Sequence, residues 1–174
     1  MLYKNIILIG PMLSGKSTIG KNLSKIFNCN FYDIDNEIEK ICGCKIYEIF
    51  LLEGEKSFRK RENKIIKDFY KKNGVIISTG GGSIIKFKNR KLLKNNNILI
   101  YLYTSVSYQI KRLDKIFNNR PLLKGYNYKK KLNKIFKIRE PIYHYIADII
   151  INTEKKIELI IKEIKKRIKF IENN

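Results

Sequence analysis

The stretch "GPMLSGKST", from Gly10 to Thr18, has the spacing Gly-x-x-x-x-Gly-Lys-Ser of a phosphate-binding loop and follows the apolar run "NIILI" directly. Glycines let successive backbone N–H groups face phosphate oxygens, and the N-terminus of the following helix adds the positive end of its dipole. Lys16 can reach the β and γ phosphates, and Ser17 can hold Mg²⁺. The loop therefore predicts a nucleotide site, and it leaves open onto which acceptor a phosphoryl group is moved.

Two carboxylates, Asp33 and Asp35 in "FYDIDNEIE", stand at the predicted end of the second strand. Ligands of an open α/β sheet bind at this edge. Residues i and i+2 of an extended segment share a face, so both carboxylates can point into one cleft. One could complete the Mg²⁺ shell through water while the other orients or deprotonates an acceptor hydroxyl. The alternative, that one of them caps the following helix, is common for aspartate and stays open.

A triple glycine in "STGGG" follows the apolar run "VIIS", and it indicates a place where the backbone must come close to a ligand. The strand before it ends without the aspartate that many P-loop enzymes place beside Mg²⁺, which leaves that role to Asp33. Arginine is scarce, at seven residues against 30 lysines. Its planar fork binds a carboxylate or phosphate through two hydrogen bonds, although each arginine alone could equally be a surface residue. The candidates are Arg59, Arg120 and Arg139.

The elements that must position these residues follow from an alternation of apolar runs with amphipathic, lysine-rich stretches. This pattern is typical of βα units, and it predicts a three-layer α/β fold in which a five-stranded parallel sheet carries helices on both faces. Strands are expected at residues 5–9, 30–33, 75–78, 97–103 and 148–152. Helices are expected at residues 16–27, 55–72, 106–117, 128–145 and 154–171.

The 174 residues are enough for one domain with a continuous core, so we expect a single domain over residues 1–174. The Asn-, Gly- and Pro-rich segment around Arg120 predicts a mobile lid at about residues 112–128. No apolar run approaches the length of a membrane span, and the first residues do not resemble a signal peptide. The three cysteines lack metal-binding spacing. We therefore expect a soluble, cytoplasmic protein.

The net charge of +21 could indicate nucleic acid or an anionic membrane as a partner. However, Ile, Lys and Asn, all encoded by A/T-rich codons, supply 33, 30 and 18 residues, so coding bias explains much of the charge. A nucleic-acid-binding protein that uses ATP as a switch is an alternative of another class, but aromatic residues do not interleave with the basic runs as a stacking platform requires. We expect a monomer that binds neither nucleic acid nor membrane.

Together the motifs resemble those of the shikimate kinase family. The motifs "GPMLSGKSTIGKNLS", "FYDIDNEIE", "EGEKSFRKRE", "STGGGS", "RPLL" and "REPIYHYIAD" occur in the family's order and at similar spacing, between Asn5 and about Asn152. The resemblance implies a P-loop kinase fold and Mg²⁺-dependent transfer of the γ-phosphoryl group of ATP to the 3-hydroxyl of shikimate, in the biosynthesis of aromatic amino acids. The runner-up is another small-molecule P-loop kinase, of gluconate type or specific for nucleoside monophosphates. The Asp-x-Asp pair, the triple glycine and two separated arginines favour a carboxylated polyol.

On the nucleotide side, the resemblance implies that Arg120 in the lid swings onto the phosphates as the site closes. The family's adenine-packing arginine falls at Leu113 here, so the role passes to the neighbouring Arg112. Lys156, in "INTEKK", stands where the family's adenine loop lies. The residues implied to bind the phosphates are Leu13, Ser14, Gly15, Lys16, Ser17 and Thr18.

On the acceptor side, the resemblance implies that Asp35 contacts the ring hydroxyls of shikimate and acts on the attacking one. Lys16 and Arg120 complete the catalytic set by facing the charge that develops on the phosphoryl group. Ser17 holds Mg²⁺, with Asp33 nearby. The residues implied to bind the shikimate carboxylate are Arg59 and Arg139, with a backbone contact from Gly81.

Overall fold

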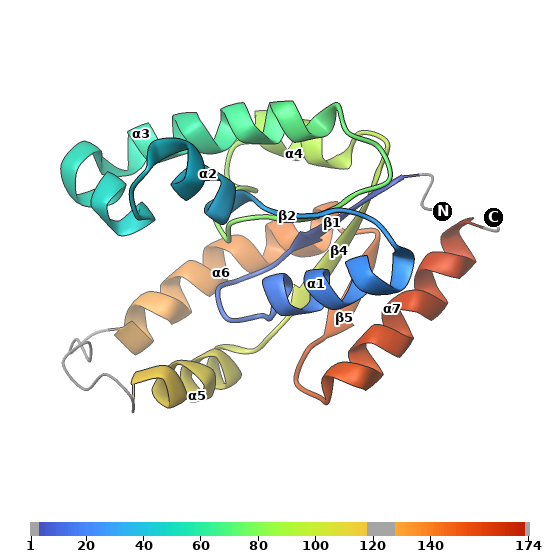
Figure 1. The fold of residues 1–174 in the computed structure, drawn as a ribbon. Helices are drawn as coiled ribbons and strands as arrows, with labels where there is room; N and C mark the ends of the chain where they lie inside the picture. The colour runs from blue at the N-terminus through green and yellow to red at the C-terminus, as the bar shows by residue number, and fades with distance from the viewer. Residues whose placement is uncertain (1–3, 118–127, 173–174) are drawn as a thin grey trace.

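The structure, a computed structural model, describes residues 4–117 and 128–172 (Figure 1). Helices and strands alternate along most of the chain, as the apolar periodicity predicts. The elements are β1 (Asn5–Ile9), α1 (Lys16–Phe27), β2 (Phe31–Asp33), α2 (Ile34–Cys42), α3 (Ile46–Tyr70), β3 (Ile76–Ser78), α4 (Phe87–Lys94), β4 (Asn97–Tyr103), α5 (Val106–Phe117), α6 (Tyr128–Ile146), β5 (Ile149–Asn152) and α7 (Ile157–Glu172).

The sheet has five parallel strands in the order β2-β3-β1-β4-β5. Register brings the ends of three neighbouring strands level, because Ser78 at the end of β3 pairs with both Asp33 of β2 and Leu8 of β1. The carboxyl ends of parallel strands meet at one edge of the sheet. The phosphate-binding loop, Asp33 and the triple glycine therefore converge there, although they lie far apart in the sequence.

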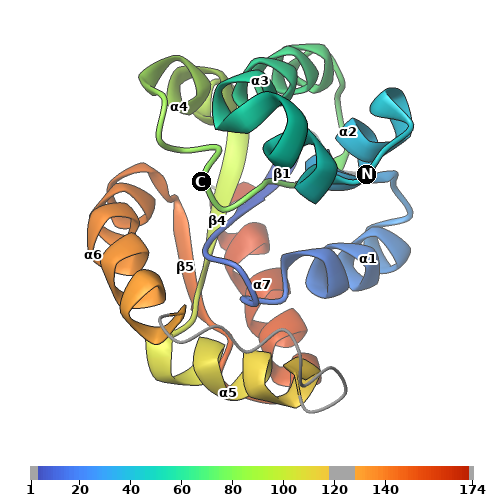
Figure 2. The same cartoon turned by 90° about the vertical axis from the view of Figure 1, so that its left-hand side faces the viewer.

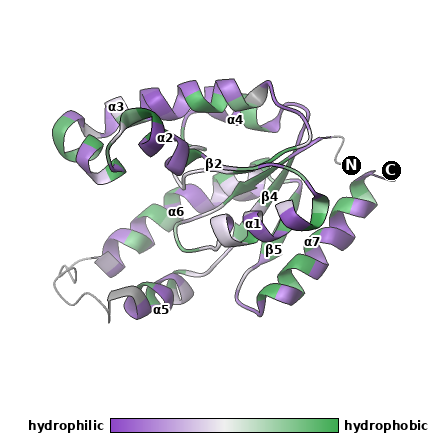
Figure 3. Ribbon diagram, in the orientation of Figure 1, coloured by the Kyte–Doolittle hydropathy of each residue, from purple (hydrophilic) through white to green (hydrophobic). Residues whose placement is uncertain are grey.

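Both faces of the sheet are covered, which explains why the strands are continuous apolar runs rather than alternating ones. Figure 2 shows α6 on one side of β4 and β5, and α1 with α7 on the other. In Figure 3 the strand β4 is mostly hydrophobic, whereas α7 alternates hydrophobic and hydrophilic residues. Side chains facing α2, α3, α4 and α6 include Ile7, Ile9, Ile77, Leu99 and Tyr101, and those facing α1 and α7 include Ile6, Leu8, Ile76, Ile100 and Leu102.

The predicted α/β fold with its five-stranded parallel sheet is confirmed. The helix α4 was not expected, and α2 was expected only in the alternative in which an aspartate caps a following helix. The helix expected from residue 55 begins earlier, at Ile46, and it is kinked at Gly54 (φ 77°, ψ 173°). The apolar pattern had marked only the part after this kink. The short helix α4, "FKNRKLLK", is mostly basic and carries too few apolar residues for a periodicity to be visible. The predicted lid lies largely outside the described residues.

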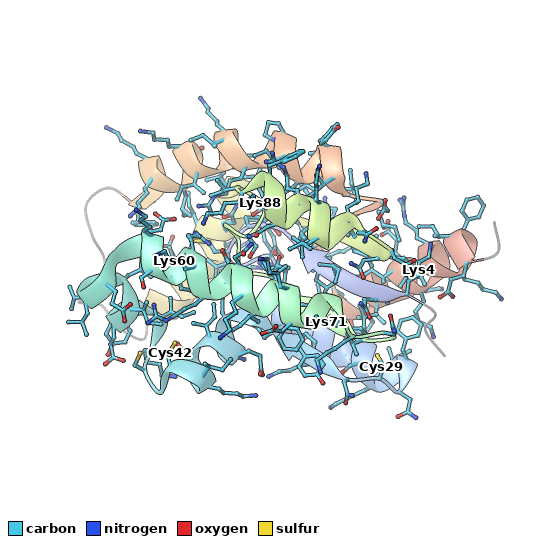
Figure 4. All side chains as sticks on the ribbon, turned by 90° about the horizontal axis from the view of Figure 1, so that it is seen from above. Lys4, Cys29, Cys42, Lys60, Lys71 and Lys88 are labelled. Atoms are coloured by element: carbon cyan, nitrogen blue, oxygen red, sulfur yellow. The ribbon has the colours of Figure 1, made fainter. Side chains whose placement is uncertain are left out.

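The surface of the molecule is lysine-rich. Lys60, Lys71 and Lys88 are exposed side chains on and beside the outer helices α3 and α4 (Figure 4). The thiols of Cys29, Cys42 and Cys44 are free. None of the helices in residues 4–117 and 128–172 has the length and apolar character needed to cross a membrane.

Candidate active site

The loop after β1 has the backbone that phosphate binding requires. Gly10 has a φ of 146°, and a Cβ there would lie 2.7 Å from the carbonyl oxygen of Leu102, so only glycine fits. Gly15 has a φ of 89° at the N-cap of α1, and Leu13 has a φ of 62°. The loop thus turns back on itself at the positive end of the helix dipole, as predicted from its spacing.

Lys16 lies within this loop, with its ammonium group held by the loop's own carbonyls. Its Nζ donates to the oxygens of Gly10 at 3.0 Å and Pro11 at 2.7 Å. Burial lowers the pKa of Lys16 to about 8, against the opposing attraction of Asp35 and Asp33. The ammonium form still prevails near neutral pH, so Lys16 offers a partly desolvated positive charge to a phosphate.

Asp33 has two tasks, and the capping alternative is correct. Its Oδ1 accepts from the backbone N–H groups of Asp35 at 3.1 Å and Asn36 at 3.4 Å, which starts α2, while its Oδ2 accepts from Ser17 Oγ at 2.5 Å. The expectation that Asp33 and Asp35 share an extended segment is therefore wrong, because the cap turns the chain into a helix immediately after Asp33. Asp35 instead lies in the first turn of α2.

The Ser17 hydroxyl and the Asp33 carboxylate, side by side at the phosphate loop, are the oxygen donors that Mg²⁺ prefers. Within the described residues no three His, Cys, Asp or Glu side chains gather as a potential metal site. Mg²⁺ characteristically takes few protein ligands and keeps waters and substrate phosphates as the others. The donor set at Ser17 and Asp33 therefore fits this ion.

Next to the loop lies a cavity of about 270 Å³. It brings together four predicted acceptor residues from three helices and the loop after β3, which are Asp35, Arg59, Gly81 and Arg139. Apolar side chains supply the rest of its wall, and they include Ile46, Phe50, Phe58, Leu132 and Phe136. A cavity with cationic groups, one carboxylate and an apolar wall suits a small, polar ring that carries a negative charge.

Asp35 is the least satisfied polar group of this cavity. Its Oδ1 is buried and has no hydrogen-bond partner among the described residues. Burial, followed by repulsion from Asp33 and Glu62, raises the pKa of Asp35 to about 6, against the attraction of Lys16 and Arg59. A buried acceptor without a donor is costly. The Asp35 side chain lies in the wall of the cavity, beside Gly80.

Arg59 is held in the cavity wall by Glu62, a residue that sequence reasoning did not single out. Arg59 Nη1 donates to Glu62 at 2.7 Å, and the wholly buried Glu62 also accepts from Ser83 Oγ at 2.6 Å. Glu55 adds a second, more exposed ion pair at 3.1 Å. The i+3 spacing of Glu62 from Arg59 in "FRKRE" was the available signal, but the same pattern is common on solvated helix faces.

The triple glycine makes room for these side chains. A Cβ on Gly82 would lie 2.1 Å from Arg59 Nη2, and one on Gly80 would lie 2.9 Å from Asp35 Oδ1. The backbone of "STGGG" thus lies close to two side chains that line the cavity. The predicted close approach to a ligand stays a prediction. Gly81 contributes its carbonyl oxygen to a 2.5 Å hydrogen bond from the Tyr143 hydroxyl.

Arg112, predicted on the nucleotide side, lies against the phosphate loop. Its Nη1 donates to the carbonyl of Leu13, its Nη2 donates to that of Thr153 at 2.8 Å, and the guanidinium lies 4.8 Å from the ring centroid of Tyr108. The segment after Thr153 leads to Lys156, which is exposed. The carbonyl of Lys156 accepts hydrogen bonds from the backbone N–H groups of Leu159 and Ile160 in the first turn of α7. Thr18 is exposed on α1. The predicted catalytic residue Arg120 lies outside the described residues.

Comparison with known proteins agrees with this arrangement. The family described as SKI: Shikimate kinase matches residues 12–169. A shikimate kinase of Hahella chejuensis is 46% identical over 153 residues, which cover 88% of this chain and 79% of that protein. The solved structure of a shikimate kinase from Acinetobacter baumannii in complex with shikimate is 37% identical with a TM-score of 0.86, covering 98% of this chain and 94% of that one.

The runner-up class shares the fold only. A gluconokinase from Sinorhizobium meliloti is similar with a TM-score of 0.61 over 93% of this chain and 89% of its own, but it is only 14% identical. This likeness confirms the architecture of a P-loop kinase and says nothing about the acceptor. The family match over nearly the whole chain and the high identity to curated relatives lead to one conclusion: the chain belongs to the shikimate kinase family.

Proposed function

We propose that this protein transfers the γ-phosphoryl group of ATP to the 3-hydroxyl of shikimate, with Mg²⁺. The observation that carries the proposal is the cavity beside the phosphate-binding loop, whose wall brings together Asp35, Arg59 and Arg139. A ring that carries a carboxylate can pair with the two arginines, and its hydroxyl groups can form hydrogen bonds with Asp35. Family membership identifies shikimate as the molecule of this class.

Binding of the acceptor depends on Arg59 and Arg139. Although burial lowers the pKa of Arg59, Glu62 and Glu55 raise it, so the guanidinium stays charged. Each charge-assisted hydrogen bond to the shikimate carboxylate is worth roughly 1.5 to 3 kcal/mol. Phe50 and Phe58, whose ring centroids lie 4.9 Å apart, supply an apolar wall for the ring. The carboxylate is thereby fixed at one end and the hydroxyls are directed to Asp35.

Activation of the acceptor is the task of Asp35. With a pKa of about 6 it is ionised near neutral pH and still basic enough to accept a proton in the transition state. It takes the proton of the attacking hydroxyl while that oxygen forms a bond to the γ-phosphorus, and the bond from phosphorus to the β–γ bridging oxygen breaks to release ADP.

Stabilisation of the transferring group comes from the nucleotide side. Lys16 exchanges its bonds to Gly10 and Pro11 for phosphate oxygens, and Arg120 adds a second positive charge. Ser17 and Asp33 would hold Mg²⁺, which would neutralise negative charge on the phosphates. Arg112, Lys156 and the loop residues Leu13 to Thr18 complete the proposed ATP site.

We further infer that the enzyme acts as a single-domain, cytoplasmic monomer with a lid at about residues 112–128, without nucleic acid or membrane as a partner. Each side of the proposed reaction is supplied by residues of this one chain. The free thiols suit a reducing compartment.

A coupled assay of ADP release tests the proposed reaction. Shikimate, gluconate and a set of nucleoside monophosphates are each offered with ATP and Mg²⁺. Only shikimate is expected to accelerate ADP release above the rate without acceptor. Acceleration by gluconate or a nucleotide, with none by shikimate, would overturn the proposal in favour of the runner-up class.

A further inference from the structure

Two buried tyrosines stack at the cavity, and one of them, Tyr143, is part of its wall. Tyr101 of β4 and Tyr143 of α6 are 0% and 1% exposed, with ring centroids 4.9 Å apart and an angle of 21° between their planes. The Tyr143 hydroxyl donates to the carbonyl of Gly81 at 2.5 Å. The Tyr101 hydroxyl is buried without a hydrogen-bond partner in the described part of the chain.

The hydrogen bond to Gly81 connects the two elements that carry the carboxylate-binding arginines. Arg139 precedes Tyr143 by four residues on α6, so both side chains lie on the same helix face. Arg59, from α3, lies across Gly82, where a Cβ would be 2.1 to 2.7 Å from its guanidinium atoms. The peptide between Gly81 and Gly82 is therefore anchored to α6 on one side and supports Arg59 on the other.

Three consecutive glycines are a very flexible backbone. Two turn hydrogen bonds hold the residues on either side of Gly81, from Ser83 N–H to the carbonyl of Gly80 and from Ile85 N–H to that of Gly82, both at 3.1 Å. The carbonyl of Gly81 itself accepts from the Tyr143 hydroxyl, which fixes the orientation of the Gly81–Gly82 peptide. The anchor itself is permanent in the working pH range: burial raises the pKa of Tyr143, against a lowering effect of Arg139, so the phenol stays protonated and remains a donor. The ring is fixed by its stacking on Tyr101, which leaves the hydroxyl pointing at Gly81.

We infer that Tyr143 is a positioning residue for the acceptor, whose hydroxyl holds the Gly81–Gly82 peptide so that Arg59 and Arg139 keep the spacing that one carboxylate requires. The inference rests on the proposed function and adds a residue that acts on shikimate through both arginines. Its specific consequence concerns the charge of the acceptor: loss of the hydroxyl weakens recognition of the carboxylate and leaves the nucleotide side intact.

The test compares Tyr143→Phe with the matched control Tyr101→Phe. Both changes keep an aromatic ring in the stack and remove one buried hydroxyl, but only the first breaks a hydrogen bond. KM for shikimate, KM for ATP and kcat are measured, together with the ratio of kcat/KM for shikimate to that for its neutral carboxamide. Thermal melting verifies that both variants are folded.

For Tyr143→Phe we expect KM for shikimate to rise about 10-fold, because the two arginines no longer hold the spacing at which both bind the carboxylate. KM for ATP stays unchanged. The preference for the acid over the carboxamide falls by a similar factor. Tyr101→Phe leaves both KM values, kcat and the preference for the acid at the wild-type values.

An unchanged KM for shikimate in Tyr143→Phe, an equal rise of both KM values, or the same effect from Tyr101→Phe would overturn the role of Tyr143. A wild-type enzyme that shows no shikimate-dependent ADP release would overturn the proposed function instead. The wild-type arm of the experiment therefore separates the two failures.

Discussion

The cavity beside the phosphate-binding loop is lined by Asp35, a carboxylate whose charged form is disfavoured by burial and by neighbouring negative charges. Asp35 lies in the first turn of α2, near Asp33 and Glu62, and its buried Oδ1 has no hydrogen-bond partner within residues 4–117 and 128–172. Such an arrangement lowers stability, and a pKa of about 6 suits the proposed role of Asp35 as a base near neutral pH. Removing this charge should therefore raise the free energy of unfolding and lower kcat.

The substitution Asp35→Asn removes the proposed base and keeps the shape of the side chain. We expect kcat to fall by about 10² to 10⁴, the usual contribution of general base catalysis. ATP affinity should change little, because Lys16 and the loop carbonyls around it are untouched. Steady-state kinetics and calorimetric titration with a non-hydrolysable ATP analogue measure the two quantities. A kcat close to that of the wild type would disprove acceptor activation by Asp35.

The stability of the same variant should depend on pH in a defined direction. The folded-state pKa of about 6 lies above the ordinary 3.8, so protonation of Asp35 favours the native state. This stabilisation is complete below the ordinary pKa and is lost as the pH rises through about 6. At higher pH the ionised carboxylate costs on the order of 2 to 3 kcal/mol, at about 1.4 kcal/mol per pKa unit.

Urea unfolding across this range measures the effect. Asp35→Asn, neutral at every pH, should be more stable than the wild type above about pH 6, and the two should converge toward pH 4. A difference that does not vary with pH would show that the charge of Asp35 carries no such cost.

At the scale of elements, the close approach of α1 to β2 provides another test. A Cβ on Gly20 of α1 would lie 2.2 Å from Cε2 of Phe31. Alanine favours helix by about 1 kcal/mol over glycine, whereas overpacking of a core costs about 1 to 3 kcal/mol. The steric term is expected to prevail, so Gly20→Ala should lower the free energy of unfolding.

The double variant with Phe31→Leu serves as the control for Gly20→Ala. The smaller side chain makes room for the new methyl group, so the double variant should lose less stability than the sum of the two single variants. Urea unfolding of the four proteins completes the cycle. A Gly20→Ala variant more stable than the wild type would mean that α1 and β2 are not in the close contact described.

The strands and most helices could be predicted because parallel strands buried on both faces form continuous apolar runs. The helix α2 could not, since its first turn follows β2 without a loop and "FYDIDNEIE" fits an extended segment as well as a capped helix. Nor could the sequence reveal Glu62 or Tyr143 as members of the site. Their residue types and spacing are ordinary for helices, and only tertiary contacts turn them toward the cavity.

The whole molecule carries a formal net charge of +21, which makes it repel itself in the compact state. Raising the NaCl concentration from about 0.01 to 0.1 M shortens the screening length from about 30 to about 10 Å. We expect the melting temperature to rise by several degrees over this range, as measured by circular dichroism. A melting temperature that falls with salt would show that attractive ion pairs outweigh the repulsion.

The central claim is the identity of the acceptor, and phosphorus NMR of the complete reaction tests it most directly. With ATP, Mg²⁺ and shikimate, the account predicts that one phosphate monoester signal grows in step with ADP and couples to the ring proton at carbon 3. Conversion of ATP to ADP and inorganic phosphate, with no phosphorylated shikimate, would contradict it.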